Sequence, residues 1–391
     1  MTPSLDRRSF AKFLGVLAGT ASLPRAAHAA GASKLPAPSA EAAVFPEPQR
    51  LPEQPILINS NENPYGPSQA ARDAFWRAQD VAGRYPDDVE DRVAQAIAQL
   101  HGVGAEQVVL GCGSTEILRL ADMAFLAPGK TLVACDPTFE AVLRYARATR
   151  AEAVQIPQTP DFRHDLPAMA AACNERTGMV YVCNPNNPNG TIVSRDELAA
   201  FVAKIPSTTM VMVDEAYFEF VEDASYGSAQ SLMRRHPNVF IVRTFSKIYG
   251  MAGLRLGYSI SSAAAASAMS AHQFSSNVNA AVGEAALASL ADARLVPHAR
   301  KVNNDLRNWL CAEMEKEGRR CLPSHTNFLM IHVGYDVTPV IEAFARRNIF
   351  VGRKFSKMEH WLRVSIGTRE EMEAFVAALR EIVPAKMARA A

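Results

Sequence analysis

Short apolar runs alternate with helix-like segments from about residue 90 onward, and this alternation constrains the fold more than any other feature of the sequence. The runs are rich in β-branched residues and read QVVLG, TLVACD, MVYVCN, TMVMVDEAY, VFIVRTFS and LGYSI. Stretches such as STEILRLADMAFLA and SRDELAAFVAKI lie between them. Strands that are apolar throughout and alternate with helices predict a mainly parallel sheet with helices on both faces. We therefore expect an α/β fold.

A second domain is expected from the length of the chain and from its C-terminal pattern. The chain has 391 residues, which is long for a single hydrophobic core. A long helical segment over 279–318 is followed by NFLMIHV, a helix near 338–347, IFVG, WLRVSIG and a final helix, which favours a smaller α+β domain. The predicted boundaries are 56–80 for an N-terminal arm that belongs to the small domain, 81–280 for the large domain and 281–391 for the rest of the small domain.

The N-terminus has the features of an export signal. The pair Arg7-Arg8 precedes an apolar stretch at about 10–23, and Ala27-His28-Ala29 has the pattern of a signal cleavage site. Because Arg-Arg-Ser-Phe-Ala-Lys is similar to a twin-arginine signal, we expect the first 30 residues to engage the twin-arginine export machinery and the protein to be periplasmic or otherwise exported. A chance amphipathic N-terminus is the alternative. Residues 31–55, rich in Pro and Ala, predict a linker or extended arm.

Charge, hydropathy and cysteine content exclude several classes of function. The formal net charge is +1 and no long basic run is present, which argues against nucleic acid as a partner. Beyond the N-terminal signal, no apolar run reaches the roughly 18 residues that suggest a membrane span. The six cysteines show neither a C-x-x-C pair nor zinc-ligand spacing, so we expect no metal site.

Candidate ligand-binding groups follow the predicted strands at their carboxyl ends, where ligands of parallel sheets bind. GCGSTE (111–116) offers backbone N–H groups at a helix start, which suits a phosphate, although Ser114 is also an ordinary helix N-cap. Phe139 follows the TLVACD run, and the rigid turn NPNNPNG (184–190) follows MVYVC. A core phenylalanine and a purely structural turn are the alternatives.

Three ionisable residues complete this set. Asp214 directly follows TMVMV, and a buried carboxylate needs a partner such as a protonated heterocyclic nitrogen. Lys247 follows VFIVRTFS, and Arg255 stands at the start of the LGYSI run. Taken alone, each has an ordinary reading, such as a solvated lysine at a strand end. Together with the N–H groups and the aromatic ring they fit one ligand, pyridoxal 5'-phosphate, whose aldehyde requires a lysine.

These motifs resemble one known family. The chain is similar to the fold-type I pyridoxal-phosphate aminotransferases of the class I/II superfamily, and most of all to the histidinol-phosphate aminotransferase branch. The resemblance covers nearly all of residues 56–380. It implies a mainly parallel, seven-stranded sheet sandwiched by helices, and a smaller α+β domain formed by the N-terminal arm and the C-terminal segment. The motifs that carry it are NENPYGPS, RYPD, GCGSTE, DPTF, NPNNPNG, DEAY, RTFSKIYGMAGLRLGY and LRVSIGT.

The resemblance implies a cofactor-binding role for each matching residue. Lys247 would be the catalytic Schiff-base lysine, and Asp214 would pair with the pyridine nitrogen. Tyr217 and Asn187 would hydrogen-bond the ring oxygen, and Phe139 would stack on the ring. The residues that would cradle the phosphate are Gly113, Ser114, Thr115, Thr244, Ser246 and Arg255.

The same resemblance implies partners and substrate contacts. Tyr65 matches a tyrosine that reaches the cofactor phosphate of a neighbouring subunit, which implies a homodimer with shared active sites. Arg363 matches the arginine that grips the substrate α-carboxylate. Asn63 is a further substrate-binding candidate. Arg353 is another, because the branch holds the remote phosphate of its substrate with an arginine near this point, where this chain reads VGRKF.

The implied activity is transamination. A pyridoxal-phosphate-dependent aminotransferase would move an amino group between an L-amino acid (histidinol-phosphate-like, aromatic or other) and a 2-oxo acid by a ping-pong mechanism, with Lys247 moving the Cα proton. The alternative is a decarboxylase, lyase or racemase on the same scaffold. A non-catalytic cofactor-binding protein has little support, because Lys247, Asp214 and Arg363 are all present. A purely structural or interaction protein would leave the residues at the strand ends unexplained.

Overall fold

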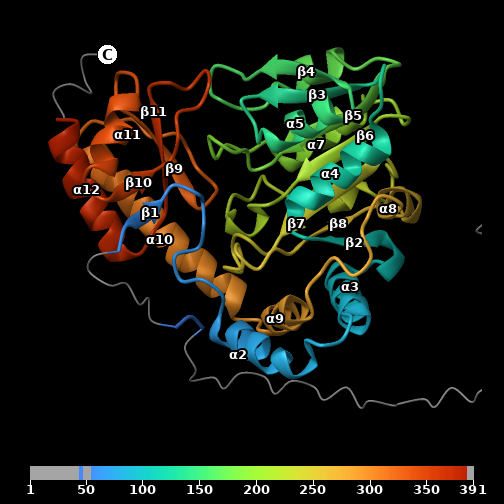
Figure 1. Cartoon of the computed structure of the whole chain (residues 1–391). Helices are drawn as coiled ribbons and strands as arrows, with labels where there is room; N and C mark the ends of the chain where they lie inside the picture. The colour runs from blue at the N-terminus through green and yellow to red at the C-terminus, as the bar shows by residue number, and fades with distance from the viewer. Residues whose placement is uncertain (1–43, 47–53, 385–391) are drawn as a thin grey trace, which may run out of the picture. The chain divides into compact units, whose positions relative to one another are not determined.

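The computed structural model describes residues 44–46 and 54–384 (Figure 1). The chain divides into the units Met1–Pro36 and Ala37–Ala391, and all described residues belong to the second. The predicted export signal and most of the predicted linker therefore lie outside the described residues. In the part of the chain that the structure describes, no helix is both long enough and apolar enough to cross a membrane.

A seven-stranded sheet lies at the centre of the described part of the chain, in the order β2-β8-β7-β6-β5-β3-β4. Its pairs are parallel, except that β8 runs antiparallel to both of its neighbours. The predicted α/β fold with a mainly parallel sheet is confirmed. The strands are β2 (Val108–Gly111), β3 (Thr131–Asp136), β4 (Glu152–Pro157), β5 (Thr177–Cys183), β6 (Met210–Asp214), β7 (Val239–Thr244) and β8 (Gly257–Ile260).

Helices cover both faces of this sheet because alternate residues of each strand are buried on opposite sides. In β6, Val211 and Val213 belong to one hydrophobic cluster and Met212 to another. The Met212 cluster includes residues of α4 (Ser114–Phe125), α5 (Ala141–Ala148) and α8 (Ala263–Ser270). The valine cluster includes residues of α3 (Asp87–His101), α6 (Leu166–Ala171), α7 (Arg195–Val202), α9 (Ala280–Ala291) and η4 (Ala229–Leu232).

Two features of the large sheet and its helices differ from the sequence analysis. The edge strand β4 was not anticipated, since half-exposed residues replace the apolar run of an inner strand. The helical segment over 279–318 is divided into α9 and α10 (Leu295–Lys316). Between them Asp292 is buried, and its Oδ1 accepts the backbone N–H of Arg294 at 3.1 Å. This side chain-to-backbone bond replaces the helical one and ends the helix.

A second hydrophobic cluster unites the two ends of the described chain. β1 (Ile56–Ile58) pairs in parallel with β10 (Ile349–Val351), so the blue strand lies among red elements in Figure 1. β9 (Phe328–His332) pairs antiparallel with β11 (Trp361–Ser365). The helices that contribute to this cluster are α10, α11 (Thr338–Ala345) and α12 (Arg369–Ile382).

The first helix of the described chain, α2 (Gln69–Arg77), packs against α9 and not against the cluster that contains β1 (Figure 1). Ala71 of α2 and Val282 of α9 both belong to the valine cluster of the large sheet. The domain boundaries at residues 80 and 280 stay predictions, since the second unit of the chain is compact as a whole. The short 3-10 helices not yet named are η1 (Ala78–Val81), η2 (Ala105–Gln107) and η3 (Phe218–Phe220).

Candidate active site

A cavity of about 690 Å³ lies at the carboxyl ends of the central strands. Because β6 lies between β5 and β7, the segments that follow Cys183, Asp214 and Thr244 leave the sheet side by side. The structure brings twelve of the predicted site residues to this one cavity. They are Ser114, Thr115, Phe139, Asn187, Asp214, Tyr217, Thr244, Ser246, Lys247, Arg255, Arg353 and Arg363.

Asp214 is a buried carboxylate at the end of β6, with only 3% of its surface exposed. Burial raises the pKa of this carboxyl to about 6, although it accepts hydrogen bonds from the Tyr181 hydroxyl at 2.8 Å and the Ala216 N–H at 3.1 Å. A cation placed against it would favour its ionised form. The protonated pyridine nitrogen of pyridoxal phosphate is such a partner.

Lys247 places its ammonium group in the same cavity. Nζ donates to the backbone oxygen of Asn61 at 2.9 Å and more weakly to that of Ser60 at 3.4 Å. The protein around this amine lowers its pKa to about 8, first by excluding water and then by the positive charge of Arg363. A depressed pKa is what a lysine needs to act as a nucleophile or base near neutral pH.

Tyr217 and Asn187 form a chain of hydrogen bonds that leads to Arg363. The Tyr217 hydroxyl accepts from Asn61 Nδ2 at 3.1 Å and from Asn187 Nδ2 at 3.5 Å. Asn187 Oδ1 accepts from Nη1 of Arg363 at 2.8 Å. Tyr217 also packs its ring edgewise against Phe328, with centroids 5.4 Å apart. These contacts hold the phenol and the amide beside the space that a pyridine ring would fill.

The loop that opens α4 forms a cradle with Arg255. A Cβ on Gly113, where φ is +79°, would stand 2.0 Å from Nη2 of Arg255, and one on Gly257 would stand 2.2 Å from the backbone nitrogen of Ser114. Nη1 of Arg255 donates to Ser246 Oγ at 3.3 Å. First-turn N–H groups of a helix have no acceptor within that helix, so they suit a phosphate. The donors present therefore fit the cofactor phosphate.

Arg363 lies on β11, with 8% of its surface exposed. Nη2 donates to the backbone oxygen of Asn59 at 2.9 Å, and burial lowers the pKa of the guanidinium to about 10. Its Nε is buried and has no hydrogen-bond partner within the described residues. Gly352 permits this packing, since a Cβ there would stand 2.9 Å from the Cβ of Arg363. A guanidinium with donor capacity to spare suits a substrate carboxylate.

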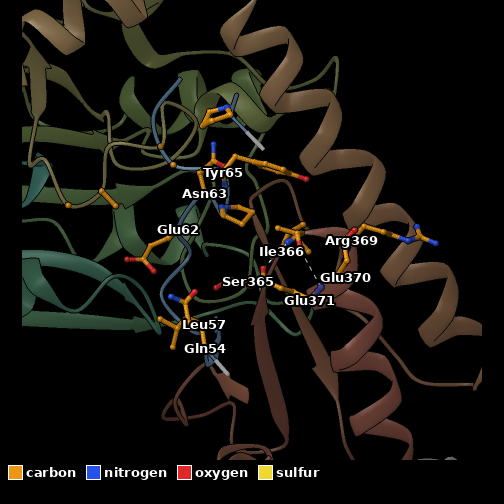
Figure 2. Close-up of a pocket in the computed structure, with 18 of the residues that line it drawn as sticks. Gln54, Leu57, Glu62, Asn63, Tyr65, Ser365, Ile366, Arg369, Glu370 and Glu371 are labelled. Atoms are coloured by element: carbon orange, nitrogen blue, oxygen red, sulfur yellow. Dashed lines mark hydrogen bonds between the residues drawn. The ribbon is translucent and has the colours of Figure 1, made fainter. Parts of the chain in front are cut away.

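Two predicted site residues, Asn63 and Tyr65, lie elsewhere. They line a neighbouring cavity of about 1010 Å³, shown in Figure 2, and not the cavity of Lys247. Asn63 Nδ2 donates to the backbone oxygen of Ile248 at 3.2 Å, and its Oδ1 accepts from the Tyr65 N–H at 3.1 Å. Glu62 lines both cavities, and in Figure 2 its side chain points away from that of Tyr65.

The sequence analysis missed several residues of the site. Tyr181 lies inside β5, where an apolar run predicts only a core residue. Asn61 is the first residue of the motif NENPYGPS, which predicts no role for it. Glu140 and Phe355 also line the cavity. Their spacing carried no signal, because their partners come from distant parts of the chain. Among the described residues, no cluster of His, Cys, Asp and Glu is arranged to hold a metal ion.

Comparison with known proteins identifies the family. Residues 53–379 match the model of the family Aminotransferase class I and II. The chain belongs to this family. It is 38% identical over 331 residues to a histidinol-phosphate aminotransferase of Moorella thermoacetica, covering 84% of this chain and 85% of that protein. It is 37% identical over 332 residues to histidinol-phosphate aminotransferase 2 of Ralstonia nicotianae, covering 83% and 87%.

A solved structure supports the same conclusion. The histidinol-phosphate aminotransferase of Sinorhizobium meliloti in complex with pyridoxal-5'-phosphate superposes with a TM-score of 0.80 at 27% identity, covering 84% of this chain and 91% of that one. This chain is thus a pyridoxal 5'-phosphate-dependent aminotransferase. The predicted fold, cofactor and enzyme class are confirmed.

The depressed pKa of Lys247 has a measurable consequence in the cofactor-free protein. The neutral amine should form as the pH rises through about 8, so reductive methylation of Lys247 should increase over that range. An Arg363→Gln change removes a nearby positive charge and should shift this increase to higher pH. Methylation is measured by peptide mass spectrometry, with exposed Lys204 as an internal reference for the reagent. An identical pH profile of Lys247 in both proteins would contradict the electrostatic coupling.

Proposed function

We propose that Lys247 moves the proton at the substrate Cα during transfer of an amino group between an L-amino acid and a 2-oxo acid. One observation carries this assignment: Lys247, Asp214 and Arg363 all line one cavity, and Asn187 hydrogen-bonds Arg363 while its other amide atom faces Tyr217. The cavity thus has a cofactor end and a substrate end with a base between them.

Each residue has a distinct task in this proposal. Asp214 binds and keeps protonated the pyridine nitrogen, Phe139 covers the ring, and Arg255 with the start of α4 binds the phosphate. Arg363 binds the substrate carboxylate and thereby orients Cα toward Lys247. When bound, the cofactor supplies the electron sink that makes loss of the Cα proton feasible. Lys247 Nζ, with its pKa lowered to about 8, accepts that proton.

A half-reaction with single amino acids tests the proposed activity. The purified protein, loaded with pyridoxal phosphate, should convert an amino donor to its 2-oxo acid in stoichiometric amount when no acceptor is added. Release of carbon dioxide or ammonia in place of the 2-oxo acid would support a decarboxylase or lyase instead. A Lys247→Ala change should reduce the rate by ~10²- to 10⁴-fold, because it removes the base. Lys204→Ala, on the surface, is the matched control and should not change the rate.

The proposed assembly is a homodimer in which Tyr65 of each subunit reaches the site of the other. Tyr65 lines a cavity of about 1010 Å³ that is separate from the site of its own chain. Three large aromatic side chains are mostly exposed among the described residues: Trp76 at 70%, Tyr85 at 86% and Phe274 at 82%. Phe274 and Tyr85 flank the hydrogen bond from Ser276 Oγ to Asp87 Oδ1. Exposed aromatic groups of this kind are typical of interfaces.

Sedimentation velocity at micromolar concentration tests the assembly. The protein should sediment with twice the mass of one chain, and Phe274→Arg should shift it toward the monomer, because a charge at the interface core would be buried unpaired. An unchanged dimer in this variant would show that Phe274 lies outside the interface. A monomeric unmodified protein would contradict the dimer itself.

The proposed location is the periplasm or the cell exterior, reached through the twin-arginine machinery. The proposal rests on Arg7-Arg8, the apolar stretch behind them and the small residues at 27–29, all of which lie outside the described residues. Replacement of Arg7-Arg8 by Lys-Lys should leave the full-length protein in the cytoplasm, as measured by cell fractionation and immunoblotting. Continued export of the Lys-Lys variant would contradict twin-arginine transport.

A further inference from the structure

One cationic residue of the cavity, Arg353, has no task in the proposed function. Of the residues that the structure describes, four cationic ones line the cavity: Lys247, Arg255, Arg353 and Arg363. The proposed function uses Lys247 as the base, Arg255 for the cofactor phosphate and Arg363 for the substrate carboxylate. Arg353 is left over, and its surroundings therefore decide how much negative charge the substrate end can accept.

Arg353 is already paired within the chain. Its Nη2 lies 2.8 Å from Oε2 of Glu140, which precedes α5 and also lines the cavity. Its Nη1 donates to the backbone oxygen of Lys354 at 3.0 Å. The guanidinium carbon lies 4.3 Å from the centroid of the Phe355 ring, which supports it from one side. The Arg353 charge is thus neutralised by an acidic side chain of the opposite wall.

The two lysines that flank this arginine are paired as well. Lys354 binds Asp336, and Lys357 Nζ lies 2.6 Å from Oδ2 of Asp136. Asp136 is the last residue of β3 and Glu140 lies four residues beyond it, so ion pairs join the loop at 352–358 to the carboxyl end of β3. Among the described residues of this loop, every lysine and arginine has an acidic partner.

Among the described residues of one chain, Arg363 is therefore the cavity cation that is left for the substrate anion. Arg363 and Arg353 approach the same Phe355 ring, at 4.7 Å and 4.3 Å, so the second guanidinium lies close by but is neutralised. A carboxylate carries one negative charge, which one guanidinium balances. A phosphate monoester carries about −1.5 to −2 at pH 7 and would leave excess negative charge beside Glu140. Like charges at close range repel each other, and this repulsion disfavours a phosphate next to Glu140.

We propose that Glu140, by pairing with Arg353, restricts the substrate anion to a carboxylate, so that this chain takes α-amino acids in preference to 2-amino alcohol phosphates such as histidinol phosphate. The inference rests on the proposed function, since it takes Arg363 as the binder of the substrate anion. Glu140 and Arg353 are specificity-determining residues in this account. Neither of them takes part in proton transfer.

The experiment compares substrates that share a side chain and an amino group and differ in the Cα substituent, which is either a carboxylate or a phosphorylated CH2OH group. L-Histidine and histidinol phosphate form the first pair. The second pair is the amino acid that reacts fastest in the half-reaction and the amino alcohol phosphate with the same side chain. The unmodified protein should show a kcat/KM at least ~10-fold higher for the carboxylate of an accepted pair. Glu140→Gln should raise the phosphate-to-carboxylate ratio by ~5-fold, the effect of freeing one solvent-accessible cation.

Further variants separate the ion pair from general effects of substitution. Adding Arg353→Gln to Glu140→Gln should abolish the gain for the phosphate, because the released cation is then missing. Glu152→Gln is the matched control: Glu152 forms a comparable exposed pair with Arg176 at 3.0 Å on the edge strand β4 and does not line the cavity. This control should leave the ratio unchanged.

Several results would overturn the inference. A preference of the unmodified protein for the phosphate would do so, as would a ratio that Glu140→Gln leaves unchanged. A loss of more than ~10-fold for the carboxylate substrate in Arg353→Gln would place the substrate anion on Arg353 instead. Failure of the proposed function looks different, because then no donor of either class yields its oxo product.

Discussion

The parallel register of β5, β6 and β7 is the constraint on which the whole site depends. Cys183 lies opposite Asp214, and Asp214 lies opposite Val242, so the three strands end nearly level with one another. The segments that leave them carry Asn187, Tyr217 and Lys247 to the same edge of the sheet. Helices on both faces bury these strands. Residues far apart in the chain thereby meet at one end of the sheet.

Paired charges stabilise the segment just beyond β6. Glu215, next to Asp214, is buried with Arg243, whose Nη2 lies 2.8 Å from Oε2 of the glutamate. Ser228 and the N–H of Ala229 donate to the same carboxylate, so its oxygens are well satisfied. A buried ion left alone would cost ~3–5 kcal/mol, which makes such a network sensitive to loss of either partner. The network is separate from the cavity but holds the turn between Asp214 and Tyr217 in place.

Much of the fold and part of the site followed from the sequence. The inner strands are continuous apolar runs. Asp214 and Lys247 stand where two of these runs end, and a charged residue at such a position indicates a binding site. The edge strand β4 was missed because its exposed face breaks the apolar run. Tyr181 was missed for the opposite reason, since a tyrosine within a buried strand looks like core until its hydroxyl is seen 2.8 Å from Asp214. The break between α9 and α10 depends on one capping contact of Asp292.

By itself, the sequence determined the order of strands and helices and the chemical groups that follow each strand. The reason is that a strand buried on both faces requires a continuous run of apolar residues, which is a local pattern. Only the tertiary structure decided which groups become partners. Arg363 meets Asn187 across 176 positions of sequence, and Arg353 meets Glu140 from the opposite wall of the cavity. Such pairs leave no periodic signal, since they depend on how β11 and the loop after β10 approach the large sheet. Whether a cation at the substrate end is available or neutralised is therefore a property of the folded chain.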